Sequence, residues 1–171
     1  MAYEETGYET IKSNKVYEIR KYSDRLAIET ATSNQNSGFR KLFNYISGNN
    51  ETNEKIKMTT PVTQMEKKGN MTMQFYLPSK FNKDNAPNPS RPDVEIVNIE
   101  GGYYAVIRYS GRSSDKNFIK HKEVLENELK KDNISILNPA IKATYNGPFT
   151  LPMFRRNEVM FEVNIKNKGE I

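Results

Sequence analysis

Two similar stretches decide the predicted fold: VYEIRKYSDRLAIETATS at residues 16–33 and DVEIVNIEGGYYAVIRYSG at residues 93–111. Glu18 of the first stretch corresponds to Glu95 of the second, and Ala27 corresponds to Ala105 after a one-residue insertion. Side chains in the first stretch alternate between the two faces of a strand, which is typical of a sheet with one buried face. An internal repeat of this kind predicts a chain built from two similar halves.

The alternation predicts two strands in the first stretch, Val16 to Tyr22 and Leu26 to Thr32, joined as a hairpin by Ser23-Asp24-Arg25. Further strands are expected in both halves. In the first half they form a β meander, which Pro61 interrupts between its first two strands. Their predicted bounds are Lys55 to Thr59, Val62 to Lys67, Met71 to Leu77, Lys142 to Asn146 and Asn157 to Ile165.

Two segments have the period of a helix instead. From Ser37 to Ile46, one apolar stripe is spaced at i, i+3, i+4 and i+7 and consists of Phe39, Leu42, Phe43 and Ile46. Gly48 is expected to end this helix. The second helix is predicted over Ser114 to Lys131, and its buried face carries Phe118, Leu125 and Leu129.

The stretch Pro78 to Pro92 is rich in Pro and Asn and is predicted to be a long loop between the halves. We expect one domain over residues 1–171, with pseudo-repeats at about 15–77 and 93–165. In each half, one helix would cover only part of the apolar face of the sheet, so we expect the sheets of the two halves to join. The predicted fold is therefore α+β, a barrel-like antiparallel sheet with two helices packed on it. A cleft lined by both halves is the expected ligand site.

Composition excludes several kinds of chemistry. The 171 residues include no cysteine and one histidine, so disulfides, thiolate nucleophiles and cysteine-ligated metals are ruled out. The 26 Lys and Arg residues outnumber the 21 Asp and Glu residues but are scattered, so we expect no nucleic-acid partner. Neither a signal peptide nor a membrane-spanning run is recognisable, and we expect a cytoplasmic monomer without a membrane partner.

Six blocks of the sequence carry a family resemblance. They are YEIRKY at 17–22, GFRKLFNYISGNNETNEKIKMTTPVT at 38–63, FYLPSKF at 75–81, AVIRYSG at 105–111, YNGPF at 145–149 and RRNEV at 155–159. Together they resemble the SOUL haem-binding protein family over about residues 16–163. The resemblance implies a distorted antiparallel barrel of eight or nine strands with two helices, built from two pseudo-symmetric β-β-α-β-β halves. The fold is similar to that of bacterial effector-binding domains.

The resemblance also implies non-covalent binding of haem or a related tetrapyrrole in an apolar groove beside the first helix, for intracellular carriage or buffering. The implied cofactor-binding residues are Phe39, Arg40, Phe43, Met153, Arg155 and Arg156, with Lys41 as a further cation for the propionates. At Asn36, Asn44 and Thr150 this chain lacks the cations that relatives carry.

The resemblance also bears on an axial ligand to the iron. Lys21 stands where one branch of the family carries a proposed axial histidine. We expect no axial bond from Lys21, because its ammonium group must first lose its proton. His121 is a weak candidate metal ligand and is otherwise a residue at the edge of the buried face.

Two alternatives belong to other classes of function. The first is a protein that uses the same cleft for another small molecule. It would be either a binding domain for a hydrophobic effector or a hydrolase-like enzyme, with a buried Glu and Tyr as acid and base. Glu158 fits that role less well than it fits an ion pair with the neighbouring arginines. The other is a protein-interaction module that presents the 78–92 loop, whose tip at residues 82–88 would then be dispensable for folding.

Overall fold

The two strands of the first repeat do not pair with each other. β3 (Glu18–Tyr22) lies between β2 (Glu9–Ser13) and β9 (Gly102–Tyr109), whereas β4 (Arg25–Thr32) lies between β7 (Asn70–Tyr76) and β8 (Glu95–Ile99). The predicted hairpin is therefore wrong. Its turn lacks the glycine and asparagine that favour two-residue hairpins, and both edges of each strand are used by other strands.

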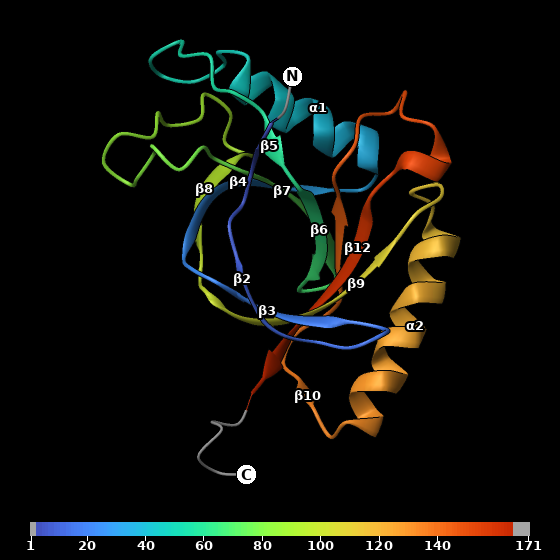
Figure 1. Cartoon of the computed structure of the whole chain (residues 1–171). Coiled ribbons are helices and arrows are strands. Elements are labelled where there is room, and N and C mark those ends of the chain that lie inside the picture. Colours follow the sequence, from blue (N-terminus) through green and yellow to red (C-terminus); the bar gives the residue numbers. More distant parts are fainter. Residues whose placement is uncertain (1–2, 166–171) are drawn as a thin grey trace. The chain divides into compact units, whose positions relative to one another are not determined.

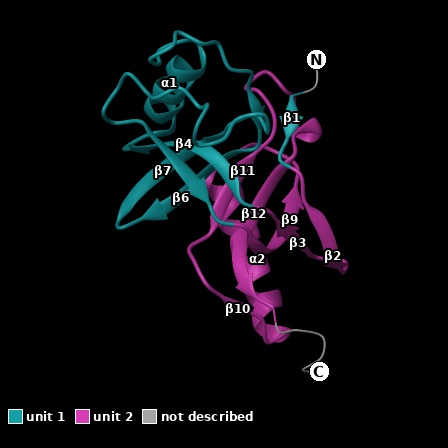
Figure 2. Ribbon diagram, turned by 90° about the vertical axis from the view of Figure 1, so that its left-hand side faces the viewer, with its two compact units in different colours: residues 1–6, 24–100 teal, residues 7–23, 101–171 magenta. Residues whose placement is uncertain are grey.

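The computed structural model describes residues 3–165, which group into two compact units (Figure 2). The first unit contains the described part of Met1–Thr6 and Asp24–Glu100, and the second contains Gly7–Ser23 and the described part of Gly101–Ile171. The corresponding strands β3 and β8 thus each pair in the unit formed mainly by the other repeat: Ile19 lies opposite Ala105, and Ile96 lies opposite Ile28. The division into pseudo-repeats within one domain stays a prediction.

The first unit is an antiparallel sheet in the order β6-β7-β4-β8, with α1 (Gln35–Ile46) packed against β4 and β7 (Figure 1). β6 spans Val62–Lys67. Two short strands, β1 (Glu4–Glu5) and β5 (Thr59–Thr60), pair in parallel with each other, and β5 precedes β6 in the sequence. The helix buries Leu42, Tyr45 and Ile46 in a core that includes Ile28 and Phe75.

Local chemistry explains the position of α1. The side chain of Asn34 caps its first turn by accepting a hydrogen bond of 2.8 Å from the backbone N–H of Ser37. After the C-cap Ser47, Gly48 takes a φ of 118°, which favours glycine. A Cβ on Gly38 would lie 2.9 Å from Cγ2 of Thr32, so a glycine here lets the helix approach the end of β4 closely.

The second unit has the sheet order β2-β3-β9-β12-β11, with the short β10 (Ser135–Ile136) also on β12 (Asn157–Asn164). Its other elements are α2 (Asp115–Lys131), β11 (Ile141–Thr144) and the 3₁₀ turn η1 (Pro152–Phe154). Leu125 and Leu129 of α2 are fully buried against Val159 and Phe161 of β12. Figure 1 shows α2 running alongside this sheet.

The α+β class, with antiparallel sheets and two helices, is confirmed. Eight or nine strands were expected; among residues 3–165 there are twelve, three of which have only two residues. Closure of the strands into a barrel stays a prediction. Both helices begin within two residues of their predicted starts and end at the predicted residues.

Three details of the first unit differ from prediction. Residues 55–58 are not a strand, because the N–H of Ile56 bonds the carbonyl of Ile46 at the end of α1, at 2.8 Å. Met71 is exposed at the start of β7, whereas the rest of its predicted face is buried. The 78–92 loop contains no helix or named strand, but Ala86 lies in the core and the hydroxyl of Tyr45 donates to the carbonyl of Pro87 at 2.6 Å. Its tip is therefore packed in the folded unit, which argues against the expectation that it is dispensable for folding.

Candidate functional site

Two exposed aromatic rings on α1 form a small apolar surface, which we call the aromatic ledge and define as Phe39 and Phe43. Their rings stack with centroids 5.9 Å apart and planes inclined by 14°. Phe39 also meets Phe75 edge-on at 5.2 Å, which fixes it against the sheet. Although both belong to the predicted apolar stripe, they are 41% and 48% exposed, while Leu42 and Ile46 of the same stripe are buried. The ledge is thus an apolar surface that is open to solvent.

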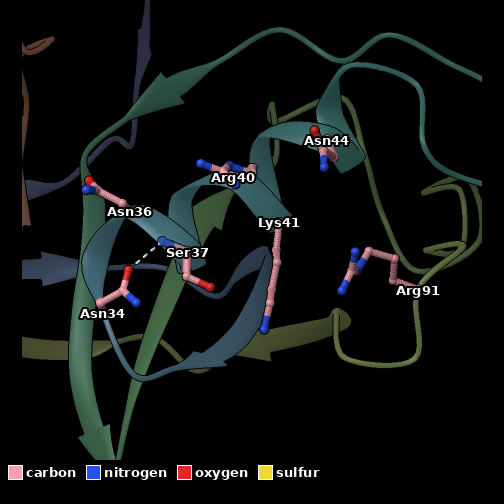
Figure 3. Close-up of a pocket in the computed structure, with 7 residues that line it drawn as sticks. All are labelled: Asn34, Asn36, Ser37, Arg40, Lys41, Asn44 and Arg91. Atoms are coloured by element: carbon pink, nitrogen blue, oxygen red, sulfur yellow. Dashed lines mark hydrogen bonds between the residues drawn. The ribbon is translucent and has the colours of Figure 1, made fainter.

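A polar hollow of about 350 Å³ lies along the same helix (Figure 3). Lys41 enters it from α1 and Arg91 from the end of the 78–92 loop, and Figure 3 shows both side chains reaching toward the same region. The remaining lining consists of the N-cap Asn34 and residues of α1, namely Asn36, Ser37, Arg40 and Asn44.

Asp93 organises the cations of this hollow. It accepts two hydrogen bonds from Arg91, at 2.8 and 2.9 Å, and its other partner is Lys41 at 3.2 Å. The hydrogen bond from Arg91, with help from Lys41, holds the pKa of Asp93 well below its usual range, so the carboxylate stays ionised. Because one carboxylate serves two cations and Arg40 adds a third, the hollow keeps a surplus of positive charge.

Arg40 connects the ledge to the hollow. It follows Phe39 directly and lies three residues before Phe43, so helix geometry places it about 60° around the axis from Phe43. Its side chain is exposed and has no hydrogen bond or ion pair with any other residue between 3 and 165. A ligand seated on the ledge could place an anionic group at Arg40.

The other three predicted cofactor-binding residues lie in the second unit. Met153, on η1, is 66% exposed. Arg155 donates to the carbonyls of Gly147 and Thr150 at 3.1 and 3.3 Å. The guanidinium of Arg156 stacks 3.8 Å above the ring of Tyr145 and hydrogen-bonds a buried carboxylate. The predicted site residues thus form two groups, one in each unit. In the second unit, Arg155 and Arg156 both already bind other parts of the protein.

That buried carboxylate belongs to Glu158, which is fully enclosed on β12. Arg20 donates one hydrogen bond of 2.8 Å to each of its oxygens, and the Tyr145 hydroxyl donates a further one. Burial alone would raise the pKa of Glu158, but the hydrogen bonds and charge of Arg20 outweigh it and lower the pKa. Burial, followed by the charge of Glu158, raises the pKa of Tyr145 far above its usual range. The expected ion pairing of Glu158 with its sequence neighbours is confirmed for Arg156, whereas Arg155 bonds backbone carbonyls. The strongest partner, Arg20, was not predicted.

His121 is half-buried on α2, as expected for an edge residue. Its ring stacks on Tyr109 with centroids 4.0 Å apart, and its Nδ1 lies 2.7 Å from the carbonyl of Asn117. Within residues 3–165, no group of three or more His, Cys, Asp or Glu side chains could hold a metal ion. Lys21 is exposed, with its ammonium 5.9 Å from the ring centroid of Tyr103.

Sequence reasoning missed Arg91 and Asp93 altogether. The only signal was a cation and an acid two residues apart at the end of a proline-rich loop, and nothing local indicates that this loop end meets α1.

Solved structures share the fold at low sequence identity. The C-terminal domain of EcmrR matches with a TM-score of 0.64 at 13% identity, covering 93% of this chain and 99% of that one. A hydrolase from Listeria innocua matches with a TM-score of 0.61 at 8% identity, covering 90% and 94% of the two chains. In the part of the chain that the structure describes, no helix is long and apolar enough to span a bilayer.

Comparison of sequences identifies relatives at higher identity. Heme-binding protein 2 of Mus musculus is 32% identical over 171 residues, covering 89% of this chain and 82% of the mouse protein. Heme-binding protein 2 of Homo sapiens is 32% identical over 158 residues, covering 84% of this chain and 76% of the human protein. The model of the SOUL heme-binding protein family matches residues 3–162. The chain therefore belongs to the SOUL heme-binding protein family.

Proposed function

We propose that this protein binds haem or a related tetrapyrrole, non-covalently, on the aromatic ledge of α1, and that it carries or buffers the ligand as a cytoplasmic monomer. The observation that carries this proposal is the stacked, half-exposed pair Phe39 and Phe43 in a member of this family. The names of the mouse and human relatives support the ligand class.

The ledge suits a flat apolar ligand. A porphyrin face that covers on the order of 200 Å² of apolar protein surface gains roughly 5 kcal/mol before the costs of association. Because the rings are already stacked and Phe39 is held by Phe75, little side-chain ordering is needed when the ligand arrives. Because a Kd of 1 μM requires about 8 kcal/mol, this apolar term alone gives at best submillimolar binding, and nanomolar binding is out of its reach.

The ligand's carboxylates would pair with the cations beside the ledge. Arg40 is the first of these, because its guanidinium is exposed and lacks a protein partner among the described residues. Lys41 and Arg91 line the hollow, where Asp93 holds them in place. Such exposed ion pairs contribute only about 0.2–1 kcal/mol each and weaken with salt. Apolar burial therefore supplies most of the affinity.

The proposal includes no axial protein ligand to the iron. Of the candidates discussed, His121 stacks on Tyr109 in the second unit, and Lys21 is an exposed side chain of β3. Haem would supply its iron and its conjugated ring, and the chain would supply an apolar seat and positive charge. Met153, Arg155 and Arg156 stay candidates for a secondary role.

An enzyme is the second candidate, because Glu158 and Tyr145 are a buried acid and hydroxyl in contact. General acid–base catalysis requires a group within reach of substrate. Both oxygens of Glu158 are occupied by Arg20, and the side chain has no exposed surface. We therefore propose binding rather than catalysis.

The test is a titration of the protein with haem, followed in the Soret band, and a parallel titration with metal-free protoporphyrin. The proposal predicts saturable binding of both, with similar affinities no tighter than about micromolar, because the iron is not ligated. An unshifted Soret band without quenching of tyrosine fluorescence would overturn haem binding. Affinity for haem far above that for protoporphyrin would show an axial ligand.

A further inference from the structure

The loop at residues 147–154 exposes four large apolar side chains, which we call the apolar loop: Phe149, Leu151, Met153 and Phe154. Phe149 is 98% exposed and Phe154 is 71% exposed, and the other two are more than half exposed. Single exposed apolar residues are ordinary on protein surfaces, but four within six residues form a patch of the kind that marks an interaction site. Of these four side chains only Met153 is a candidate for tetrapyrrole binding, and the proposal on α1 does not account for the other three.

The loop backbone is held in place by several hydrogen bonds. The N–H of Gly111 donates to the carbonyl of Pro152 at 2.9 Å, which ties the loop to the turn that precedes α2. From the other side, Arg155 donates to the carbonyls of Gly147 and Thr150. The side chains are therefore presented outward by a fixed turn.

Positive charge accompanies the apolar loop. Residues 145–157 contain no acidic side chain, and Arg155 directly follows Phe154. The guanidinium of Arg155 bonds backbone carbonyls and keeps its charge, whereas Arg156 is paired with Glu158. Arg112 is exposed and adjoins Gly111, which bonds the loop. A surface that combines apolar side chains with arginines complements a bilayer with anionic headgroups, where the apolar groups enter the acyl boundary and the cations meet phosphates.

We propose that the apolar loop is a peripheral membrane anchor that inserts into the surface of an anionic bilayer. The loop is short and its four apolar side chains lie close together in sequence, which suits insertion better than a stable protein interface of about 800 Å² on each partner. This inference rests on Phe149 and Phe154, which the proposed tetrapyrrole site does not use.

The first experiment is co-sedimentation of the full chain with vesicles of phosphatidylcholine alone or with added phosphatidylserine. We expect sedimentation with the anionic vesicles, weaker binding to neutral ones, and loss at high salt. The double variant Phe149→Ser, Phe154→Ser should bind at least roughly tenfold more weakly, and Arg112→Gln about fivefold. Leu137→Ser, which removes an exposed leucine elsewhere in the second unit, is the matched control and should bind like the unmodified chain.

The second experiment uses the absence of tryptophan from the sequence. Phe149→Trp places a single tryptophan at the loop tip, and its emission, excited at wavelengths where tyrosine does not absorb, should shift to the blue on anionic vesicles and be quenched by brominated acyl chains. No sedimentation with either vesicle, or a double variant that binds as well as the unmodified chain, would overturn the proposal. So would a double variant that leaves lipid binding intact but abolishes self-association, which would identify a second copy as the partner.

Discussion

Arg20 and Glu158, 138 residues apart in the sequence, form two hydrogen bonds of 2.8 Å inside the second unit. Arg20 lies on β3 and Glu158 on β12, and both strands pair with β9. The pair therefore connects the N-terminal part of the chain to its C-terminal strand. It also explains why a carboxylate without exposed surface stays ionised.

Removal of one member of this pair is expected to be costly. Glu158→Ala leaves the guanidinium of Arg20 buried without its main partner, and loss of one partner of a buried ion pair typically costs about 3–5 kcal/mol. The measurement is urea unfolding followed by circular dichroism. Glu126→Ala, which breaks the exposed pair with Lys122, is the control and should change the free energy of unfolding by less than about 1 kcal/mol. Equal effects of both variants would contradict the assignment.

The same carboxylate predicts a dependence of stability on pH. The pKa of Glu158 is lower in the folded chain than its ordinary value of 4.5, so the unfolded chain takes up a proton first as the pH falls. Its contribution to stability is full above that ordinary value and is lost as the pH falls toward the folded pKa. The free energy of unfolding of Glu158→Gln should therefore fall less steeply below about pH 4.5 than that of the unmodified protein. Parallel pH profiles would show that Glu158 does not titrate as described.

The 78–92 loop should contribute to the stability of the first unit. Tyr45→Phe removes only the hydroxyl that donates to the carbonyl of Pro87 and should cost about 1 kcal/mol in thermal unfolding. Deletion of residues 82–88 removes the buried Ala86 as well and should cost considerably more. A deletion variant as stable as the unmodified chain would contradict the packing of this loop.

The helices could be predicted because their chemistry is local. Phe39, Leu42, Phe43 and Ile46 mark one face of α1, but periodicity does not reveal which of them a ligand reaches. The hairpin was predicted wrongly because alternation identifies strands and not their partners. β2 was missed, since Ile11 is the only large apolar side chain in Glu9–Ser13. The hollow depends on a contact between Asp93 and Lys41, 52 residues earlier, which no local pattern encodes.

Substitution of Arg40 and a higher salt concentration should each lower tetrapyrrole affinity only modestly. Arg40→Gln removes an exposed cation beside the ledge, and we expect less than about a tenfold loss, which shrinks further at high salt. Arg112→Gln removes an exposed arginine of the second unit and should leave Soret affinity unchanged. A loss of affinity with Arg112→Gln alone would place the ligand's carboxylates in the second unit.

The most direct test of the central claim compares Phe43→Asp with Phe149→Asp in Soret titrations with haem. Both replace an exposed phenylalanine by a carboxylate, but one lies on the aromatic ledge and the other on the apolar loop. The account predicts that Phe43→Asp weakens binding by about tenfold or more, because it places a charge against the porphyrin face, while Phe149→Asp binds like the unmodified protein. Loss of binding in Phe149→Asp with full binding in Phe43→Asp would contradict the account.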